Sequence, residues 1–427
     1  MIFFKTLLLI VILITTTSFV SAQSPNLDDI LLDHIYKENI KTLQIHKEGW
    51  ALSAPIIALN TADRIQISFD DLTSDIKNYS YTIVHCDANW RQSDIMPADY
   101  IEGFTDNKIN DYTQSFNTLY QFIHYNLFIP NEDIKPKLSG NYIVKIYENY
   151  DSENIVAIKR FCISDNKIEI QAQVKQATLA DLRSQYQEID FSLFYNLPVN
   201  DVFNDIKVVL TQNNRWDNAI TGLKPLFIKD KELEYSYDEE NTFLAGNEYR
   251  RFDLKSIRYQ SDRIKGFSFE KPYYHVLLYD DENRHFKQYF SDKDLNGRYF
   301  IENSDAQNAA TDADYVYVHF SLPYEEPLAS DIYIFGALSN WNINEEYKMT
   351  YNVDLKKYEA TILLKQGFYN YSYAYLDKQT NKVDETLLEG SHYETENDYI
   401  IYVYYKNISL RYDQLVGVKF LNTQNKQ

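Results

Sequence analysis

Alternating aromatic residues constrain the fold of this chain more than any other feature of the sequence. In residues 369–375 (YNYSYAY), tyrosine occupies every second position, and a period of two recurs in residues 314–320 (DYVYVHF) and 140–147 (GNYIVKIY). Successive side chains of a β-strand point to opposite faces, so this pattern places one set of rings on one face. The chain also holds 38 Tyr and 24 Phe against 11 Gly, and aromatic residues favour pleated, half-buried surfaces. The sequence therefore predicts an all-β protein.

Turn clusters between the expected strands predict tandem immunoglobulin-like or early-set β-sandwich domains rather than an α/β sheet. Residues 23–32 form a polar lead-in, and the first domain is expected at residues 33–164. The second domain is expected at residues 167–301. Residues 302–314 (ENSDAQNAATDAD) are small and polar without apolar periodicity, which predicts a linker. A third domain then spans residues 315–427.

Residues 1–22 are typical of a secretory signal peptide. One early cation, Lys5, precedes an apolar run at residues 7–14, and small residues end the segment at Ala22. We expect cleavage after Ala22 and export of the mature chain. A membrane-spanning helix needs about 20 apolar residues, and threonines at residues 15–17 interrupt this run, although an uncleaved anchor is the alternative. No cysteine lies at the cleavage point, which argues against a lipoprotein.

The charge of the chain limits its partners. The formal net charge is −20 at pH 7, and an acidic surface repels phosphate backbones and anionic headgroups. We therefore expect no nucleic-acid partner. No segment after the signal approaches 18 unbroken apolar residues, so we also expect no direct lipid insertion. Solubility alone also explains an acidic surface.

The two cysteines, Cys86 and Cys162, both fall in the expected first domain. Two outcomes are open: a disulfide in an oxidising compartment, or two small core residues. His85 and Asp87 flank Cys86, and His124 follows later in the chain. These residue types are common metal ligands, so a metal site has to be considered. In a regular strand, however, His85 and Asp87 point away from Cys86, and no zinc-type spacing is present. We expect no metal here, with His85 and Asp87 hydrogen-bonded at a strand end.

Residues 292–297 (DKDLNG) match the first six positions of an EF-hand loop. The twelfth position is Asn303, where that loop requires Glu. The flanking segments at residues 286–290 (FKQYF) and 298–301 (RYFI) alternate like strands, and Asn-Gly is a strong hairpin signal. This segment predicts a tight turn and no calcium site.

The expected third domain resembles the immunoglobulin-like modules that bind glycogen or precede starch-enzyme barrels. The resemblance lies in residues 332–341 (IYIFGALSNW) and 365–377 (KQGFYNYSYAYLD). Trp341 matches one of two sugar-stacking tryptophans of such modules. The other is missing from residues 377–383 (DKQTNKV), and no lysine stands near Ser372. The resemblance therefore implies the fold, and we expect Trp341 to anchor a loop.

Catalytic motifs are missing from the sequence. It contains no G-x-S-x-G, no P-loop and no G-x-G-x-x-G. Arg250 and Arg251, beside Glu248 and Asp253, can clamp an anion, but surface ion pairing is the commoner use of such residues. We expect neither catalytic residues nor a cofactor, so the chain is not predicted to be an enzyme.

A series of landmarks between residues 79 and 142 carries a more specific resemblance. It reads YSYTIVHCDANW, PADYIEGF, DYTQSFNT, HYNLFIPNE and SGNY, and further blocks follow over nearly all of the mature chain. The later blocks are QNNRWDNA (212–219), GNEYRRFD (246–253), DLNGRYF (294–300), LLKQGFYNYSY (363–373), EGSHYETENDY (389–399) and VYYKN with RYDQLVG (403–417). In these blocks the chain resembles the type IX secretion system plug proteins.

The resemblance implies a place and a partner for the protein. Plug proteins of this family are periplasmic and close the outer-membrane β-barrel translocon through which folded cargo leaves. By resemblance, this chain is expected at the inner face of the outer membrane, where it reversibly occludes the periplasmic opening of that barrel when no cargo is engaged. The alternative is a periplasmic or secreted carbohydrate-binding accessory protein.

Overall fold

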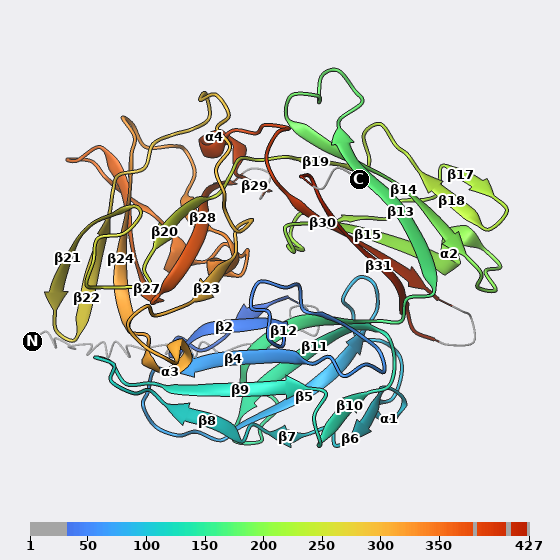
Figure 1. Ribbon diagram of the computed structural model, residues 1–427, viewed down its shortest axis with the longest axis horizontal. Helices are drawn as coiled ribbons and strands as arrows, with labels where there is room; N and C mark the ends of the chain where they lie inside the picture. Colours follow the sequence, from blue (N-terminus) through green and yellow to red (C-terminus); the bar gives the residue numbers. More distant parts are fainter. Residues whose placement is uncertain (1–31, 379–381, 407–410, 425–427) are drawn as a thin grey trace, which may run out of the picture.

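The computed structural model describes residues 32–378, 382–406 and 411–424, so the expected signal peptide at residues 1–22 and its cleavage point lie outside the described part. The described part is all-β, which confirms the predicted fold class. Its strands form three β-sandwich units. Figure 1 shows the first unit along the bottom, the second above it on the right and the third above it on the left.

The first unit contains only strands from the N-terminal part of the chain. Its elements are β1 (His34–Ile35), β2 (Ile40–Lys47), β3 (Ile56–Ala58), β4 (Ile65–Asp71), β5 (Tyr79–Cys86), α1 (Pro97–Tyr100), β6 (Ile101–Gly103), β7 (Asn107–Lys108), β8 (Asp111–Gln114), β9 (Ile123–Ile129), β10 (Ile134–Pro136), β11 (Gly140–Glu148) and β12 (Ile155–Ser164). One sheet has the order β1-β12-β11-β5-β7, with β3 parallel to β12, a second has the order β2-β4-β9-β8, and β10 pairs with β6 in a small third sheet. Apolar side chains of these sheets form a common core.

The second unit combines strands from the middle and the C-terminal end of the chain. Its elements are β13 (Ile168–Gln176), β14 (Tyr186–Tyr195), α2 (Val202–Asp205), β15 (Ile206–Gln212), β16 (Ile220–Thr221), β17 (Phe227–Lys229), β18 (Glu232–Tyr235), β19 (Thr242–Leu244), β30 (Asp398–Tyr405) and β31 (Gln414–Asn422). The sheet β13-β14-β18-β17 packs on the sheet β16-β15-β30-β31 around a second core.

The third unit contains the remaining strands. Its elements are β20 (Arg250–Asp253), β21 (Ile264–Glu270), β22 (Tyr273–Leu278), β23 (Tyr299–Ile301), α3 (Ala309–Asp312), β24 (Tyr315–Pro323), β25 (Ile332–Phe335), η2 (Ala337–Ser339), η3 (Glu345–Tyr347), β26 (Thr350–Asn352), β27 (Lys357–Lys365), β28 (Gly367–Asp377), β29 (Lys382–Asp384) and α4 (Thr386–Glu389). The sheet β21-β22-β24-β27-β26 packs on a sheet centred on β28, which pairs with β20, β23, β25 and β29.

Strand pairing groups the chain differently from the boundaries that composition indicates. β20 to β23 lie within the expected second domain at residues 167–301, but β20 and β23 pair with β28 of the third unit. β30 lies within the expected third domain at residues 315–427, but it pairs with β15 of the second unit. The expected linker at residues 302–314 connects β23 with β24 inside one unit and carries α3. Composition reports the local character of a segment and not its distant pairing partner.

The alternating tyrosines lie on β28, as the period of two predicts. Tyr369, Tyr371 and Tyr373 are buried, and so are the intervening Asn370 and Ser372, because both faces of this strand are covered. The hydroxyls of Tyr371 and Tyr373 both donate to Asp281 Oδ2 at 2.6 and 2.7 Å. Buried rings thus fill the core while their polar ends are satisfied.

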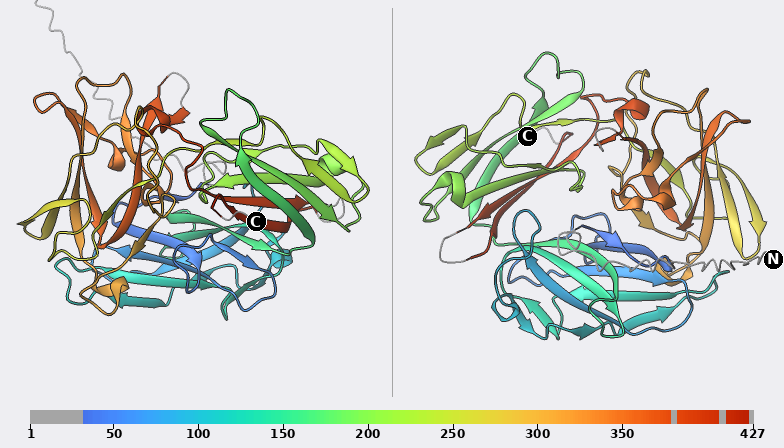
Figure 2. Two further views of the ribbon diagram at one scale, coloured as in Figure 1. Left: turned by 45° about the horizontal axis from the view of Figure 1, so that its top comes forward. Right: turned by 180° about the vertical axis from the view of Figure 1, so that it is seen from behind.

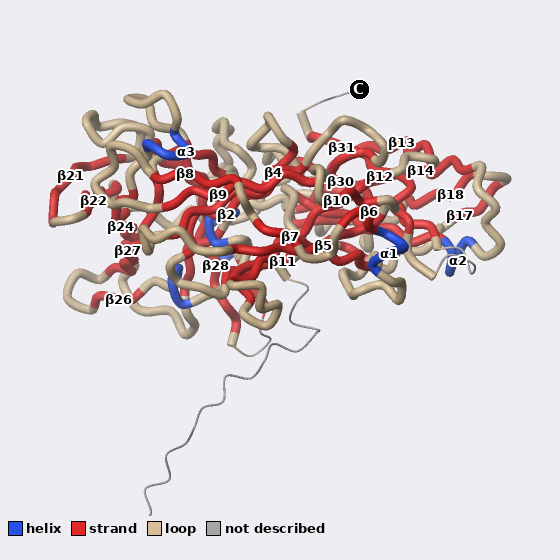
Figure 3. The backbone as a smooth tube through the Cα atoms, turned by 90° about the horizontal axis from the view of Figure 1, so that it is seen from below, coloured by secondary structure: helices blue, strands red, loops and turns tan. Residues whose placement is uncertain are grey.

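The three units form one closely joined body. Figure 2 shows the second and third units standing side by side on the first, and Figure 3 shows the first unit from below, lying across the middle of an elongated molecule. Contacts between units therefore decide how rigid the molecule is.

Candidate functional site

The cluster at His85 has a structural role. His85 is fully buried, with Nδ1 2.8 Å from the Ser93 hydroxyl and Nε2 3.2 Å from the Ser139 carbonyl oxygen. Burial lowers the pKa of His85 to about 4. Asp87 accepts hydrogen bonds from the backbone N–H groups of the turn that follows. Among the residues described, no group of three or more His, Cys, Asp or Glu side chains has a geometry that could hold a metal ion.

The two cysteines are free, so the disulfide is not formed. Cys86 on β5 and Cys162 on β12 both lie opposite Asn141 of the intervening strand β11. Two strand spacings separate them by about 10 Å, whereas a disulfide requires Cα atoms within about 7 Å. Cys162 Sγ donates to Asn141 Oδ1 at 3.3 Å. Burial raises the pKa of Cys86 to about 12, so its thiol stays protonated.

The calcium-like segment forms a turn tied to its neighbours. Asn296 and Gly297 have φ angles of 53° and 76°, as a type I′ turn requires. The turn does not join two regular strands, because residues 286–290 are irregular. Asp292 pairs with Arg251 at 2.6 Å, and Asp294 accepts from backbone N–H groups. Burial raises the pKa of Asp294 to about 7.

Trp341 packs at the junction of the second and third units. Its ring contacts Phe335 and Tyr249 at centroid distances of 5.4 and 5.9 Å, and the Arg215 guanidinium lies 4.6 Å from the ring centroid. A Cβ atom on Gly297 would overlap the ring, so only glycine fits below it. Arg215 thus lies over the Trp341 ring, which is partly buried at this junction.

The Arg250–Arg251 pair forms ion pairs within the protein. Buried Arg250 donates to Glu389 Oε1 and Oε2 at 3.0 Å and to Asp281 at 3.1 Å. Arg251 pairs with Asp262 and Asp292 near the surface. Burial acts to raise the pKa of Glu389, but Arg250 and Arg284 outweigh it and lower that pKa to about 2.

A buried charge cluster joins the first unit to the third. Lys365 Nζ on β27 donates to Asp70 Oδ2 on β4 at 2.5 Å, and both side chains are almost fully buried. Tyr315 OH also donates to Asp70 at 2.6 Å, and His124 Nδ1 lies 2.6 Å from the other carboxylate oxygen. Burial acts to raise the pKa of Asp70, but Lys365 and His124 outweigh it and hold that pKa below its usual range.

The junction of the first and second units is mainly apolar. One face of the sheet containing β5, β11 and β12 packs on β15, β30 and β31, with both cysteines in the contact. Trp90 and Trp216 meet edge to face at 4.8 Å. Tyr404 OH donates to Asn141 Oδ1 at 2.8 Å, and the Ala88 N–H donates to Asp413 at 2.9 Å. Packing across this junction resembles the interior of a single domain.

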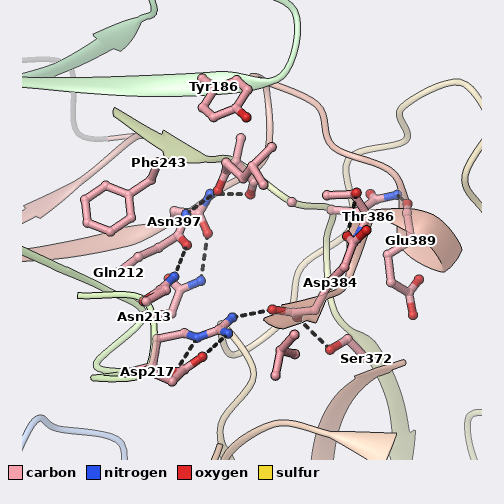
Figure 4. A pocket seen from close by; sticks show the side chains of 18 of the residues that line it. Tyr186, Gln212, Asn213, Asp217, Phe243, Ser372, Asp384, Thr386, Glu389 and Asn397 are labelled. Atoms are coloured by element: carbon pink, nitrogen blue, oxygen red, sulfur yellow. Dashed lines mark hydrogen bonds and ion pairs between the residues drawn. The ribbon is translucent and has the colours of Figure 1, made fainter. Parts of the chain in front are cut away.

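The second and third units meet around a cavity of about 880 Å³ (Figure 4). Gln212, Asn213 and Asn397 of the second unit line one side, and residues of β28 and residues 382–389 line the other. At its base Arg215 Nη1 donates to Glu385 Oε1 at 2.6 Å, which links the two units. Outside the cavity, Arg298 pairs with Asp398 at 2.8 Å across the same junction.

Large apolar side chains are exposed elsewhere. In the described part, the most exposed aromatic residues are Phe286 (92%), Phe290 (77%) and Phe116 (72%). The loop that carries Phe286 and Phe290 is anchored, since Arg284 donates to Glu389 at 2.8 Å and Tyr289 OH donates to Glu248 at 2.5 Å. Exposed aromatic residues on a fixed loop are candidate contacts for a partner.

Sequence reasoning singled out neither Asp70, Lys365 nor Arg215, although these residues join the units. The one available signal was a charged residue at the end of a largely apolar segment, as in residues 65–70 (IQISFD) and 361–365 (TILLK). Among the residues described, no helix is long and apolar enough to cross a membrane.

Comparisons with known proteins agree with the fold. Residues 40–165 match the family described as the type 9 secretion system plug protein first domain. Among solved structures, the chain is similar to the crystal structure of a hypothetical protein from Parabacteroides merdae ATCC 43184 at 2.30 Å resolution. The identity is 37% and the TM-score 0.89, and the match covers 92% of this chain and 99% of that one. No curated protein matches this chain.

Proposed function

Because the chain belongs to the type 9 secretion system plug protein family, we propose that it is a non-catalytic plug of the outer-membrane translocon of that system. In this proposal, the protein docks at the periplasmic opening of the translocon barrel and occludes it reversibly when no cargo is engaged. It works in the periplasm, at the inner face of the outer membrane, after export by the cleaved signal. No cofactor takes part.

The observation that carries the proposal, beside family membership, is the way the three units are joined. A steric plug must resist deformation, and each pair of units is fixed by buried or partly buried contacts: Asp70–Lys365, Asn141–Tyr404 and Arg215–Glu385. A body that is already rigid loses little conformational entropy when it docks, so little of the binding free energy is offset by ordering. Reversible blocking then needs an interface of ordinary size and moderate affinity.

Carbohydrate binding is the weaker candidate. It would use Trp341, but that ring lies between Arg215 and neighbouring side chains, and its sugar-stacking partner is missing from residues 377–383.

The test is entry of a large dye, or of an antibiotic that the outer membrane normally excludes, into a strain lacking the protein. We expect the deletion to leak and the wild-type gene to restore the seal. Substitutions at His85, Asp87 or Asp294 should restore it too if the variants fold, because blocking does not depend on reactive groups.

Charge on the docking surface should open the barrel. Phe116→Asp, Phe286→Asp and Phe290→Asp change exposed side chains that support no core, so each variant should fold. We expect at least one of them to leak, with Val353→Asp (Val353 is 76% exposed and aliphatic) as the matched control. A deletion strain that leaks no more than its parent would refute occlusion. If a soluble activity disappeared with one polar substitution instead, an enzyme should be sought.

A further inference from the structure

Two histidines of the third unit form a hydrogen-bonded pair. His275 on β22 and His319 on β24 lie on adjacent parallel strands, and His275 Nδ1 is 2.8 Å from His319 Nε2. Their rings stack at a centroid distance of 5.1 Å. Both side chains are partly exposed, so protons from the solvent can reach them. The proposed function makes no use of this pair.

A hydrogen bond between two imidazoles depends on their protonation. One of the two facing nitrogens must carry a hydrogen and donate, and the other must be free to accept. A first added proton does not break the bond, because it goes to the free nitrogen on the far side of the donating ring. A second proton leaves a hydrogen on both facing nitrogens. The bond is then lost, and two like charges lie in contact.

Charges of both signs surround the pair. His275 Nε2 lies 3.8 Å from Glu270 Oε2 on β21, and His319 Nδ1 lies 3.0 Å from the Thr361 hydroxyl on β27. Two carboxylates and two ammonium groups line the hollow beside His319, namely those of Asp280, Glu359, Lys265 and Lys357. The nearby cations and anions are thus equal in number, and the contact between the two imidazoles is the closest charge interaction of the pair.

The direction of the pH effect follows from these surroundings. Burial and the neighbouring His275 lower the pKa of His319, although Glu270 and Glu359 act in the opposite direction. His319 therefore binds a proton less readily in the folded protein than in the unfolded chain. Its contribution to stability is complete above about pH 6.5 and falls as the pH decreases below that value.

A row of aromatic rings connects the pair with the first unit. Tyr317 stacks on His275 at 5.1 Å and meets Tyr273 edge to face at 4.9 Å. Tyr273 in turn stacks on Tyr120 of the first unit at 5.1 Å. Tyr120 and Tyr273 both belong to an apolar cluster at the junction of the two units. A change at the pair therefore acts on strands that contribute to this junction.

The hairpin of β21 and β22 lies at the edge of its sheet. β21 is the outermost strand, at the left of Figure 1, and β22 pairs with β24 through residues 275–277. Val276 and Leu278 of β22 are buried and hold the hairpin on the core. The histidine pair adds a side-chain bond between β22 and β24 at this short pairing.

We propose that the His275–His319 pair is a pH-sensitive switch at this edge. With at most one proton bound, the pair stabilises the contact between β22 and β24. With both histidines charged, the bond is lost and the β21–β22 hairpin opens more often, which also weakens the contact of Tyr273 with Tyr120. The inference does not depend on occlusion of the translocon.

The test is hydrogen–deuterium exchange of the full mature protein, followed by mass spectrometry of peptides that cover residues 264–278. Protection factors correct for the intrinsic pH dependence of exchange. We expect protection of these residues to fall roughly tenfold between about pH 7.5 and about pH 5. Residues 168–195, which contain no histidine, provide the internal reference and should change less.

Two variants separate the pair from other effects of acid. In His319→Gln, the amide oxygen can still accept from His275 Nδ1, but the side chain cannot be charged. The loss of protection at low pH should therefore disappear. His34→Gln removes an exposed histidine of β1, in the first unit, and should leave the loss unchanged.

Three results would overturn the proposal. They are equal protection of residues 264–278 at both pH values in the wild-type protein, the same loss in His319→Gln as in the wild type, and disappearance of the loss in His34→Gln. Thermal melting at neutral pH checks that each variant folds. If His319→Gln fails this check, His275→Asn takes its place, because its amide group can donate to His319 Nε2 and cannot be charged.

Discussion

Replacing Lys365 with alanine should destabilise the molecule at the contact between the first and third units. The side chain of Lys365 is 1% exposed. Its ammonium donates to Asp70 at 2.5 Å and to the Ala310 carbonyl oxygen at 2.6 Å, and lies 4.1 Å from the centre of the Phe122 ring. Its removal leaves a carboxylate that is fully buried without its cation. Removing one partner of a buried ion pair typically costs about 3–5 kcal/mol.

The structure places Lys365→Ala near the lower end of that range. His124 and Tyr315 still contact the Asp70 carboxylate at 2.6 Å and stabilise part of its charge. We therefore expect the free energy of unfolding to fall by about 3 kcal/mol. Because the pKa of Asp70 is lowered in the folded state, its stabilising contribution is present above about pH 4 and is lost as the pH falls below that. Lys365→Ala should therefore lose less stability than the wild-type protein when the solution is made acidic.

The assay is urea denaturation followed by tryptophan fluorescence, with a double-mutant cycle. Asp70→Asn alone should also destabilise, since it leaves the buried ammonium. Asp70→Asn combined with Lys365→Ala removes both charges and should cost less than the sum of the two single changes by about 2 kcal/mol. Lys356→Met, which breaks the exposed pair with Glu325, is the control and should leave stability unchanged. Strict additivity in the cycle, or no loss in Lys365→Ala, would refute the reasoning.

Four further predictions follow from individual sites. Cys86 and Cys162 should resist iodoacetamide in the folded protein and both react in denaturant without reductant, as mass spectrometry can show; one unreactive pair would indicate a disulfide. Trp341→Ala should lower the free energy of unfolding by roughly 2–3 kcal/mol, and calorimetry of the parent protein with linear glucans should show no heat. Because the pKa of Asp294 is raised in the folded protein, this carboxyl group ionises at a lower pH in the unfolded chain than in the folded one. The contribution of Asp294 to stability should therefore fall as the pH rises from about 4 to about 7. Asp294→Asn should flatten urea-derived stability over that range, and an unchanged slope would contradict this. Mass spectrometry of the exported protein should find its N-terminus directly after Ala22, and recovery of the intact leader in membranes would speak against export.

Local patterns predicted the strands well because alternation is a local property. The tyrosines at residues 369–375 fall on β28, and the runs at residues 140–147 and 314–320 fall on β11 and β24. Alternation did not reveal that both faces of β28 are covered, since Asn370 and Ser372 look like solvent-facing residues in sequence. They are buried because β28 lies beneath further segments of its own unit and the Leu295 N–H donates to Asn370 Oδ1.

The sequence did not predict which strands far apart in the chain pair with one another. Nothing in residues 206–212 indicates that they pair with residues 398–405, because the register depends on tertiary contacts. The same limit applies to the junctions. Asp70 and Lys365 each stand at the end of an apolar run, but only the fold shows that the two runs meet. A charged residue at such a position indicates that it has a buried partner. It does not indicate which residue that partner is.

The interleaved topology bears on how the protein can work. β30 and β31, near the C-terminal end, complete the second unit, while β20 to β23 complete the third. The second unit therefore cannot form from one continuous stretch, because the third unit, at residues 250–389, is inserted between β19 and β30. Two chain segments thus connect these two units. The first unit is held to both, by an apolar sheet-to-sheet contact on one side and by the Asp70–Lys365 pair on the other. From these contacts we expect the molecule to move as one body, so that release of a docked plug, in the proposed function, would occur at the surface it shares with its partner.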